Sequence, residues 1–324
     1  MKGSGAAFLV HVTRPIHQRS FSVIFSSRGG LDALLERKRP SAWQQFFSAP
    51  AVYTARTICN WRPATPAQSS STPITVVCVS DTHNSQPYIP PGDILIHAGD
   101  LTQFGSFQKL QTSIDWLNIL PHKHKIVVAG NHDLHLDPAF RNPNPEQRGT
   151  IEWGNIRYLQ DDSIDLKCAG GRTVRVFGNP WIIRHGNWAF QYPHSVDVWR
   201  NTIPPNTDIL VTHTPPRGHL DLKYSGCAFL LDELWRLKSK PRLHVFGHVH
   251  EGYGQEWVMF DGLQKAYEDV MRGERGFWAL WRVVLQFLKV RTWPGKGGPT
   301  LIVNAAMVGG LRDEVKRVAV TVQL

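Results

Sequence analysis

The sequence is poor in cysteine and lacks a long apolar run. Its four cysteines are widely separated and show no Cys-x-x-Cys spacing, so they predict neither a disulfide framework nor a thiolate zinc site. No stretch of eighteen or more apolar residues occurs, which argues against a transmembrane helix. Self-similarity at the periods of solenoid repeats is also missing. These absences favour an intracellular globular protein with an ordinary apolar core.

Acidic residues are scarce in the N-terminal part of the chain, and the net charge of +10 is unevenly distributed. Residues 1–71 contain nine Lys or Arg against two acids, which gives this segment a net charge of +7. Residues 255–298 add +2 and leave about +1 for all other residues. A nucleic-acid-binding surface would be basic across the folded core. We therefore expect no nucleic-acid polymer as a partner.

The N-terminal region has the composition of an appendage. Its first 31 residues contain no acid, four basic residues and five serines, which is compatible with a mitochondrial transit peptide and equally with a disordered N-terminus. Residues 63–73 are a Pro/Ser/Thr linker. We predict a basic extension and linker over 1–71 and one domain over 72–324. The expected location is cytoplasmic, with mitochondrial or membrane-peripheral placement as alternatives.

A short apolar, β-branched run is followed at once by polar residues five times. Such runs predict buried strands, and their alternation with helices, for example over 107–120, predicts a layered α/β domain. Further strands over 173–177, 301–303 and 319–323 are expected to form a second sheet. The five expected strands and the residues that follow them are 74–80 with Asp81 and His83, 94–98 with Asp100, 125–129 with Asn131 and His132, 209–212 with His213, and 243–246 with His248 and His250.

These polar residues are the types that bind a pair of divalent cations. Carboxylate, imidazole and amide oxygen ligands suit hard or borderline ions, so Mn, Fe, Zn or Co would be accepted. Two ions roughly 3.5–4 Å apart stabilise both oxygens of an in-line displacement and lower the pKa of a bound water toward about 7. The expected chemistry is phosphoester hydrolysis by metal-bound hydroxide. We expect His132, held by the adjacent Asp133 carboxylate, to protonate the leaving oxygen.

Taken together, the five motifs resemble those of the calcineurin-like metallophosphoesterases. The segments that begin at His213 and Gly247 resemble the small metallophosphoesterase-domain subfamily of fungi and animals. The resemblance implies an α/β fold with a two-sheet β-sandwich flanked by helices, and a phosphodiester or phosphomonoester substrate, with cyclic nucleotides among the candidates. It also implies one ion held by Asp81, His83, Asp100 and His250 and a second held by Asp100, Asn131, His213 and His248, with Asp100 as the bridge.

Two other functions remain open at this point. A protein Ser/Thr phosphatase shares the same metal chemistry, and a non-catalytic membrane or scaffold protein could keep metals for stability alone. Arg217 and His219 could contact a substrate phosphate, or they could lie on a solvated loop. The sequence alone does not choose between these alternatives.

The chain departs from the subfamily by an insertion over 255–298. Its second half, residues 277–293, is rich in aromatic residues, and a helix there would have a narrow polar stripe and a broad apolar face. Residues 277–298 contain four cations and no acid. Residues 43–62 repeat this aromatic and basic composition. Both segments predict peripheral membrane contact, and the alternative is a helix docked on the domain or on another subunit.

Overall fold

A computed structural model describes residues 41–62, 72–140, 149–222, 225–273, 276–292, 298–310 and 312–324. The possible transit peptide lies outside these residues, as do most of the predicted linker and Trp293. Among the described residues, no helix is both long enough and apolar enough to cross a bilayer. Residues Lys38–Leu324 belong to one compact unit.

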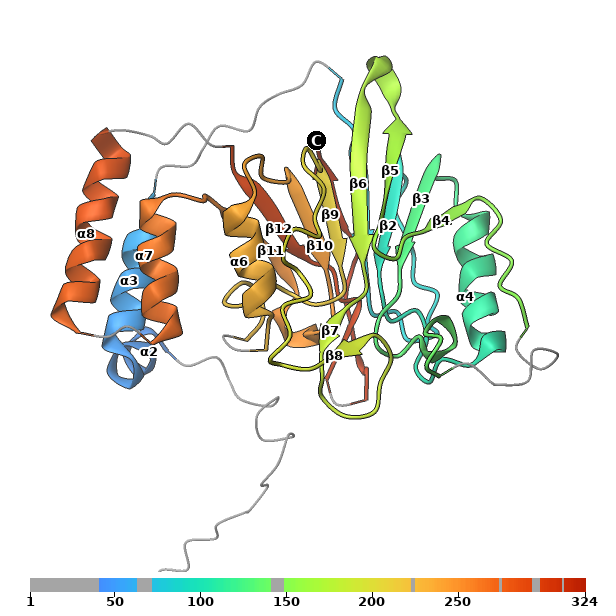
Figure 1. Ribbon diagram of the computed structural model, residues 1–324, viewed down its shortest axis with the longest axis horizontal. Coiled ribbons are helices and arrows are strands. Elements are labelled where there is room, and N and C mark those ends of the chain that lie inside the picture. The colour runs from blue at the N-terminus through green and yellow to red at the C-terminus, as the bar shows by residue number, and fades with distance from the viewer. Residues whose placement is uncertain are drawn as a thin grey trace, which may run out of the picture. The chain divides into compact units, whose positions relative to one another are not determined.

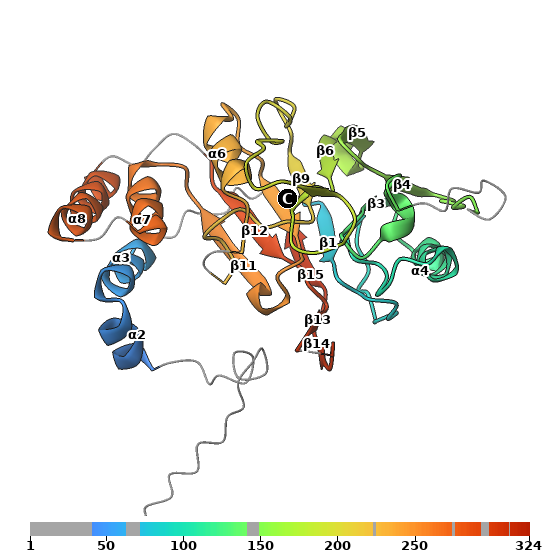
Figure 2. The same ribbon diagram turned by 60° about the horizontal axis from the view of Figure 1, so that its bottom comes forward.

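Two sheets pack face to face, as Figures 1 and 2 show. In the first sheet, strands β1 to β4 run parallel in sequence order, and β15 adds an antiparallel edge beside β1. Period-two alternation places Val76 and Cys78 between the sheets and Val77 and Val79 on the outer face. Its strands are β1 (Thr75–Val79), β2 (Ile94–Ala98), β3 (His124–Val128), β4 (Ile156–Tyr158) and β15 (Val320–Gln323).

The second sheet has six strands in the order β11-β12-β10-β9-β6-β5, with a parallel centre and two antiparallel edges. Its strands are β5 (Asp162–Lys167), β6 (Thr173–Asn179), β9 (Ile209–Thr212), β10 (Leu243–Phe246), β11 (Gly254–Val258) and β12 (Thr300–Asn304). Short pairs join β7 (Ile182–Ile183) to β8 (Gln191–Tyr192) and β13 (Val308–Gly309) to β14 (Val315–Lys316). The 3₁₀ turns are η1 (Leu134–Leu136), η2 (Ala169–Gly171) and η3 (His250–Gly252).

The predicted strands are confirmed, but their distribution between the sheets differs from the prediction. The first three motif strands lie in one sheet, and the last two lie in the other. The strand expected over 319–323 is β15, which joins the first sheet and not the second. The reason is its pairing with the free edge of β1, where Val322 lies opposite Val76 and both side chains enter the core between the sheets.

Helices cover the outer faces of the sandwich. Helix α4 (Phe107–Ile119) begins where the Ser106 side chain accepts a hydrogen bond from the Lys109 amide, and it packs Leu110 and Ile114 on the first sheet. Helix α6 (Ala228–Arg236) packs Leu230 and Leu234 on the second sheet. The resulting order of layers is helix, sheet, sheet, helix, as the predicted fold class requires.

A separate group of helices combines the N-terminal region with the insertion. It consists of α2 (Ala42–Ser48), α3 (Pro50–Asn60), α7 (Gly262–Arg272) and α8 (Phe277–Thr292), and we call it the helical module. Ala55, Leu263 and Val283 lie at the centre of its own apolar core. The first residues of the predicted insertion, in contrast, form β11 and pair with β12.

Candidate metal centre

The five predicted motifs converge at one edge of the two sheets. Each stands directly after a parallel strand, and the carboxyl ends of parallel strands point the same way. Three overlapping groups of residues each place their ligand atoms within 4.8 Å of one another. The two remaining predicted ligands, Asn131 and His248, form a hydrogen bond with each other in the same place. The groups are Asp81, His83 and His250; His83, Asp100 and His132; and Asp81, Asp100 and His213.

The backbone at this edge adopts left-handed conformations that residues other than glycine rarely adopt. Asp81, His83, Asp100 and His248 all have φ between 46° and 66°, in the small left-handed region of backbone space. Strained residues of this kind cluster at functional sites, where they aim side chains at a common point.

Glycine makes room for the two buried aspartates. A Cβ at Gly130 would lie 2.2 Å from Asp100 Oδ1, and one at Gly247 would lie 1.9 Å from Asp81 Oδ2. These are steric overlaps with the side chains expected to bind ions. The glycines of the motifs therefore leave space for ligands as well as allowing the chain to turn.

One half of the centre contains Asp81, His83 and His250. His250 Nε2 lies 3.2 Å from Asp81 Oδ1, and His83 Nε2 lies 3.6 Å from Asp100 Oδ2. Behind these imidazoles stands Asp313, whose Oδ2 accepts a 2.7 Å hydrogen bond from His83 Nδ1. A carboxylate in this position fixes the ring and leaves the other nitrogen facing inward. Asp313 was not predicted from the sequence, because it belongs to none of the five motifs.

The other half contains Asn131, His213 and His248. His213 Nδ1 donates to the Ala98 carbonyl at 2.8 Å, so Nε2 is the nitrogen that faces the centre. That Nε2 lies 3.1 Å from Asn131 Oδ1 and 3.2 Å from Asp100 Oδ2. His248 Nδ1 lies 2.9 Å from the same Asn131 oxygen. Asp100 therefore lies between the two halves.

These contacts fit a bound cation better than they fit a hydrogen-bond network. His83 Nε2 is buried and has no hydrogen-bond partner, which is a costly arrangement for a polar atom. Burial lowers the pKa of His248 to about 3, with the charge of His213 adding to the effect, so this imidazole is neutral. A divalent cation among these atoms would accept lone pairs from the inward-facing imidazole nitrogens and from the Asn131 and carboxylate oxygens together.

The ionisation of the two aspartates agrees with this interpretation. Burial would raise the pKa of Asp81, but the hydrogen bond from His250 lowers it to about 2. Burial acts in the same direction on Asp100, whereas His213 and His83 hold its pKa well below the ordinary value. Both carboxylates are consequently anions, as metal ligands must be.

His132 lies at the centre, but Asp133 does not hold its ring. The His132 ring donates from Nδ1 to the Gln103 carbonyl at 2.7 Å. The Asp133 carboxylate instead accepts bonds from the amides of Gly130 and Thr102 at 2.9 and 3.0 Å. The predicted contact between the two residues is wrong, because Asp133 is buried against the backbone of its own and the preceding loop. Asp133 organises these loops, and a backbone carbonyl orients His132.

The loop between β7 and β8 brings two further aromatic residues to the site. The Trp188 ring packs on His132 with centroids 4.2 Å apart, and His185 lies beside His248 at 5.0 Å. Neither residue was predicted from the sequence. No motif marks them, since their place depends on how this loop crosses the open edge of the sandwich.

His219 has a different environment from either predicted alternative. It is 2% exposed, with Nδ1 2.8 Å from Glu256 of β11 and Nε2 3.3 Å from Glu268 of α7. Burial would lower the pKa of His219, but the two carboxylates raise it to about 10. The neighbouring His244 of β10 has its pKa lowered to about 3 by burial. His219 therefore neither contacts substrate nor lies in a solvated loop, and it ties α7 to the loop that follows His213.

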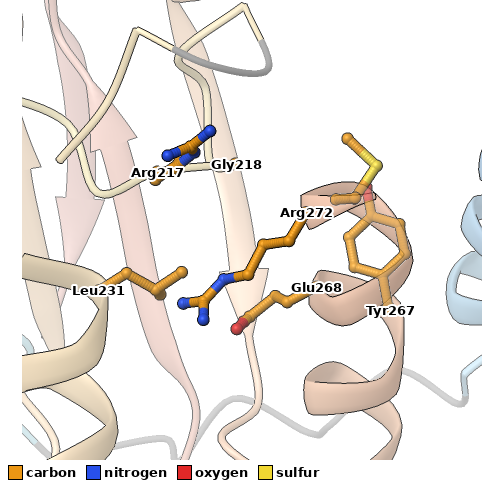
Figure 3. Close-up of a pocket in the computed structure, with 7 residues that line it drawn as sticks. Arg217, Gly218, Leu231, Tyr267, Glu268 and Arg272 are labelled. Atoms are coloured by element: carbon orange, nitrogen blue, oxygen red, sulfur yellow. The ribbon is translucent and has the colours of Figure 1, made fainter. Parts of the chain in front are cut away.

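A small cavity lies beside this contact, between α6 and α7 (Figure 3). Leu231 lines it from α6, Tyr267 and Arg272 line it from α7, and Arg217 approaches from the loop that carries His219. Its volume of about 10 Å³ holds roughly one water molecule. The cavity is too small for a substrate.

Comparison with known proteins agrees with the geometry. The family model of the calcineurin-like phosphoesterases matches residues 74–252, which include every predicted ligand. The chain belongs to this family. Human metallophosphoesterase domain-containing protein 1 is 39% identical over 213 residues, 57% of this chain and 62% of that protein. A UPF0046 protein of Caenorhabditis elegans is 37% identical over 201 residues, 55% of this chain and 69% of that protein. These relatives support the small metallophosphoesterase-domain subfamily.

A longer match covers most of the chain. A protein of Emericella nidulans named probable rhamnogalacturonate lyase C is 44% identical over 303 residues, 91% of this chain. Only 29% of that protein is matched, so its name describes a much longer chain. This chain likewise spans less than two thirds of the human relative. The shared family is thus shown by the matched domain, and the names of whole proteins do not transfer to it.

Proposed function

We propose that this phosphoesterase hydrolyses a phosphodiester or phosphomonoester with two divalent cations. Asp81, His83, Asp100 and His250 would hold one ion, and Asp100, Asn131, His213 and His248 the other. The observation that carries the proposal is the position of Asp100, which lies 3.6 Å from His83 of one half and 3.2 Å from His213 of the other. A single short carboxylate shared in this way serves two ions.

The bound cations would supply Lewis acid stabilisation and lower the pKa of a coordinated water. The protein's own groups then position the phosphoester and move the proton. With its Nδ1 proton engaged by Gln103, His132 presents Nε2 to the centre, where a protonated ring donates to the leaving oxygen. Trp188 covers one face of that ring and keeps it from turning away.

The bridge is tested with Asp100→Asn, which preserves shape and removes the shared charge. Hydrolysis of bis-p-nitrophenyl phosphate and p-nitrophenyl phosphate is measured with Mn, Fe, Zn and Co, and bound metal is measured in parallel. We expect a loss of activity of at least ~10²-fold, by analogy with removing one electrostatic contact to a transition state. A cyclic nucleotide and a phosphoserine peptide, tried in the same assay, separate a diesterase from a protein phosphatase.

Asp115→Asn is the matched control, because Asp115 lies on the exposed side of α4 and hydrogen-bonds Gln111. It should hydrolyse both substrates as the wild type does. Full activity of Asp100→Asn, or a wild-type protein that holds no transition metal under any loading condition, would refute the proposal.

A further inference from the structure

Helix α8 has two apolar faces, and among the residues that the structure describes only one of them is packed. Leu280, Val283 and Phe287 recur at helical spacing and enter the core of the helical module against α3 and α7. Trp278, Trp281, Leu285 and Leu288 recur at the same spacing on the other face and are exposed. We call these four residues the outer face of α8. Trp278 alone is 75% exposed, and contiguous exposed apolar surface of this kind marks an interaction site.

The charged residues of α8 itself are all cations. Helix α8 contains Arg282, Lys289 and Arg291 and no acid. Arg282 is half exposed and pairs with Asp269 of α7 at 2.8 Å, while Lys289 and Arg291 are exposed near the other end of the helix. The surface therefore complements a negatively charged one.

We propose that the outer face of α8 docks on the surface of an anionic membrane. Tryptophan is favoured at the boundary between headgroups and hydrocarbon, and Lys and Arg beside it gain from anionic lipid. The sixteen residues of α8 span about 24 Å, less than the ~30 Å of a hydrocarbon core. The helix therefore lies along the membrane surface.

The packing of α8 in the helical module determines what docking requires of the rest of the chain. Because the inner face of α8 is already packed, docking requires no unfolding of the module and orders no new segment. Binding should then depend on two additive contributions, apolar insertion by Trp278 and Trp281 and attraction by Lys289 and Arg291. It should not depend on metal, since none of these residues belongs to the metal centre.

Flotation of the full chain with vesicles tests the proposal. One set contains phosphatidylcholine alone, and the other contains about 30% phosphatidylserine. We expect binding to the anionic vesicles that weakens as salt rises. Trp278→Ser with Trp281→Ser should weaken it at least tenfold. Lys289→Gln with Arg291→Gln should weaken it by about fivefold for each charge, as for a cation near an anionic surface.

Trp257→Ala is the matched control. Trp257 is an exposed tryptophan of β11 outside the helical module, so this variant should float as the wild type does. Circular dichroism confirms that each variant is folded. The proposal is overturned if the wild type stays unbound, if it binds both vesicle types equally, or if the double tryptophan variant floats unchanged. If instead the wild type fails to float and forms a dimer, and the double tryptophan variant is monomeric, the outer face of α8 binds a second copy of the chain.

Discussion

The Asp313→Ala variant should release one of its two metal ions more readily than the other. Asp313 Oδ2 lies 2.7 Å from His83 Nδ1, and its Oδ1 lies 3.8 Å from His250 Nδ1. It thus stands behind two imidazoles of the same half and touches neither His213 nor His248 among the described contacts. Losing such a partner costs about 10- to 100-fold in metal affinity or activity. This corresponds to about 1.4–2.7 kcal/mol.

The assay is a chelator titration of the Mn- or Zn-loaded protein with both bound ions counted. In Asp313→Ala, one ion should leave at about 10- to 100-fold lower chelator concentration, while the other leaves as in the wild type. Asp313→Asn keeps an oxygen that can accept the His83 Nδ1 proton, so it should lose less than tenfold. Equal release of both ions in Asp313→Ala, at wild-type chelator concentrations, would show that the carboxylate does not position these ligands.

Three further changes probe the loops around the centre. Trp188→Ala frees one face of the His132 ring, so kcat/KM for bis-p-nitrophenyl phosphate should fall about tenfold. The number of bound ions should stay unchanged, and loss of metal would contradict the role of Trp188 in orienting His132. Gly130→Ala places a Cβ 2.2 Å from a buried ligand oxygen and should abolish metal retention, whereas Gly298→Ala, in open space, should not. The raised pKa of His219, about 10 in the folded chain against 6.5 normally, favours folding below about pH 6.5, and this stabilisation is lost as pH rises toward 10. Urea unfolding across that range should show a steeper decline for the wild type than for His219→Gln, and parallel curves would refute the pairing.

The parts of the fold that sequence predicts well are local. The five motif strands are recognised because each is a short β-branched run that is buried on both faces, as in β2, where every residue is buried. The sheet to which each strand belongs is a non-local property. Strand β15 could not be placed from its own residues, because its partner β1 lies at the opposite end of the domain in sequence.

In the metal centre, too, residues placed by local sequence could be predicted, and residues placed by non-local packing could not. Asp81, His83 and Asp100 could be predicted because each follows its strand directly, and the strand fixes where it points. Asp313 and Trp188 could not, since their positions depend on how loops cross the sheet edge. The burial of His219 was missed for a related reason: its partners come from β11 and α7, 37 and 49 residues away.

The helical module is joined to the metal centre through this same histidine. Glu268 of α7 contacts His219 on the loop that follows His213, and it also accepts a 2.7 Å bond from Trp235 of α6. The inner face of α8 packs on α7, so the outer face of α8 has a fixed relation to that loop. Deleting the whole insertion would remove both Glu256 and Glu268 and leave the buried His219 ring without these hydrogen-bond partners. Exchanging exposed side chains of α8 leaves these contacts intact, and it therefore separates membrane docking from the integrity of the catalytic domain.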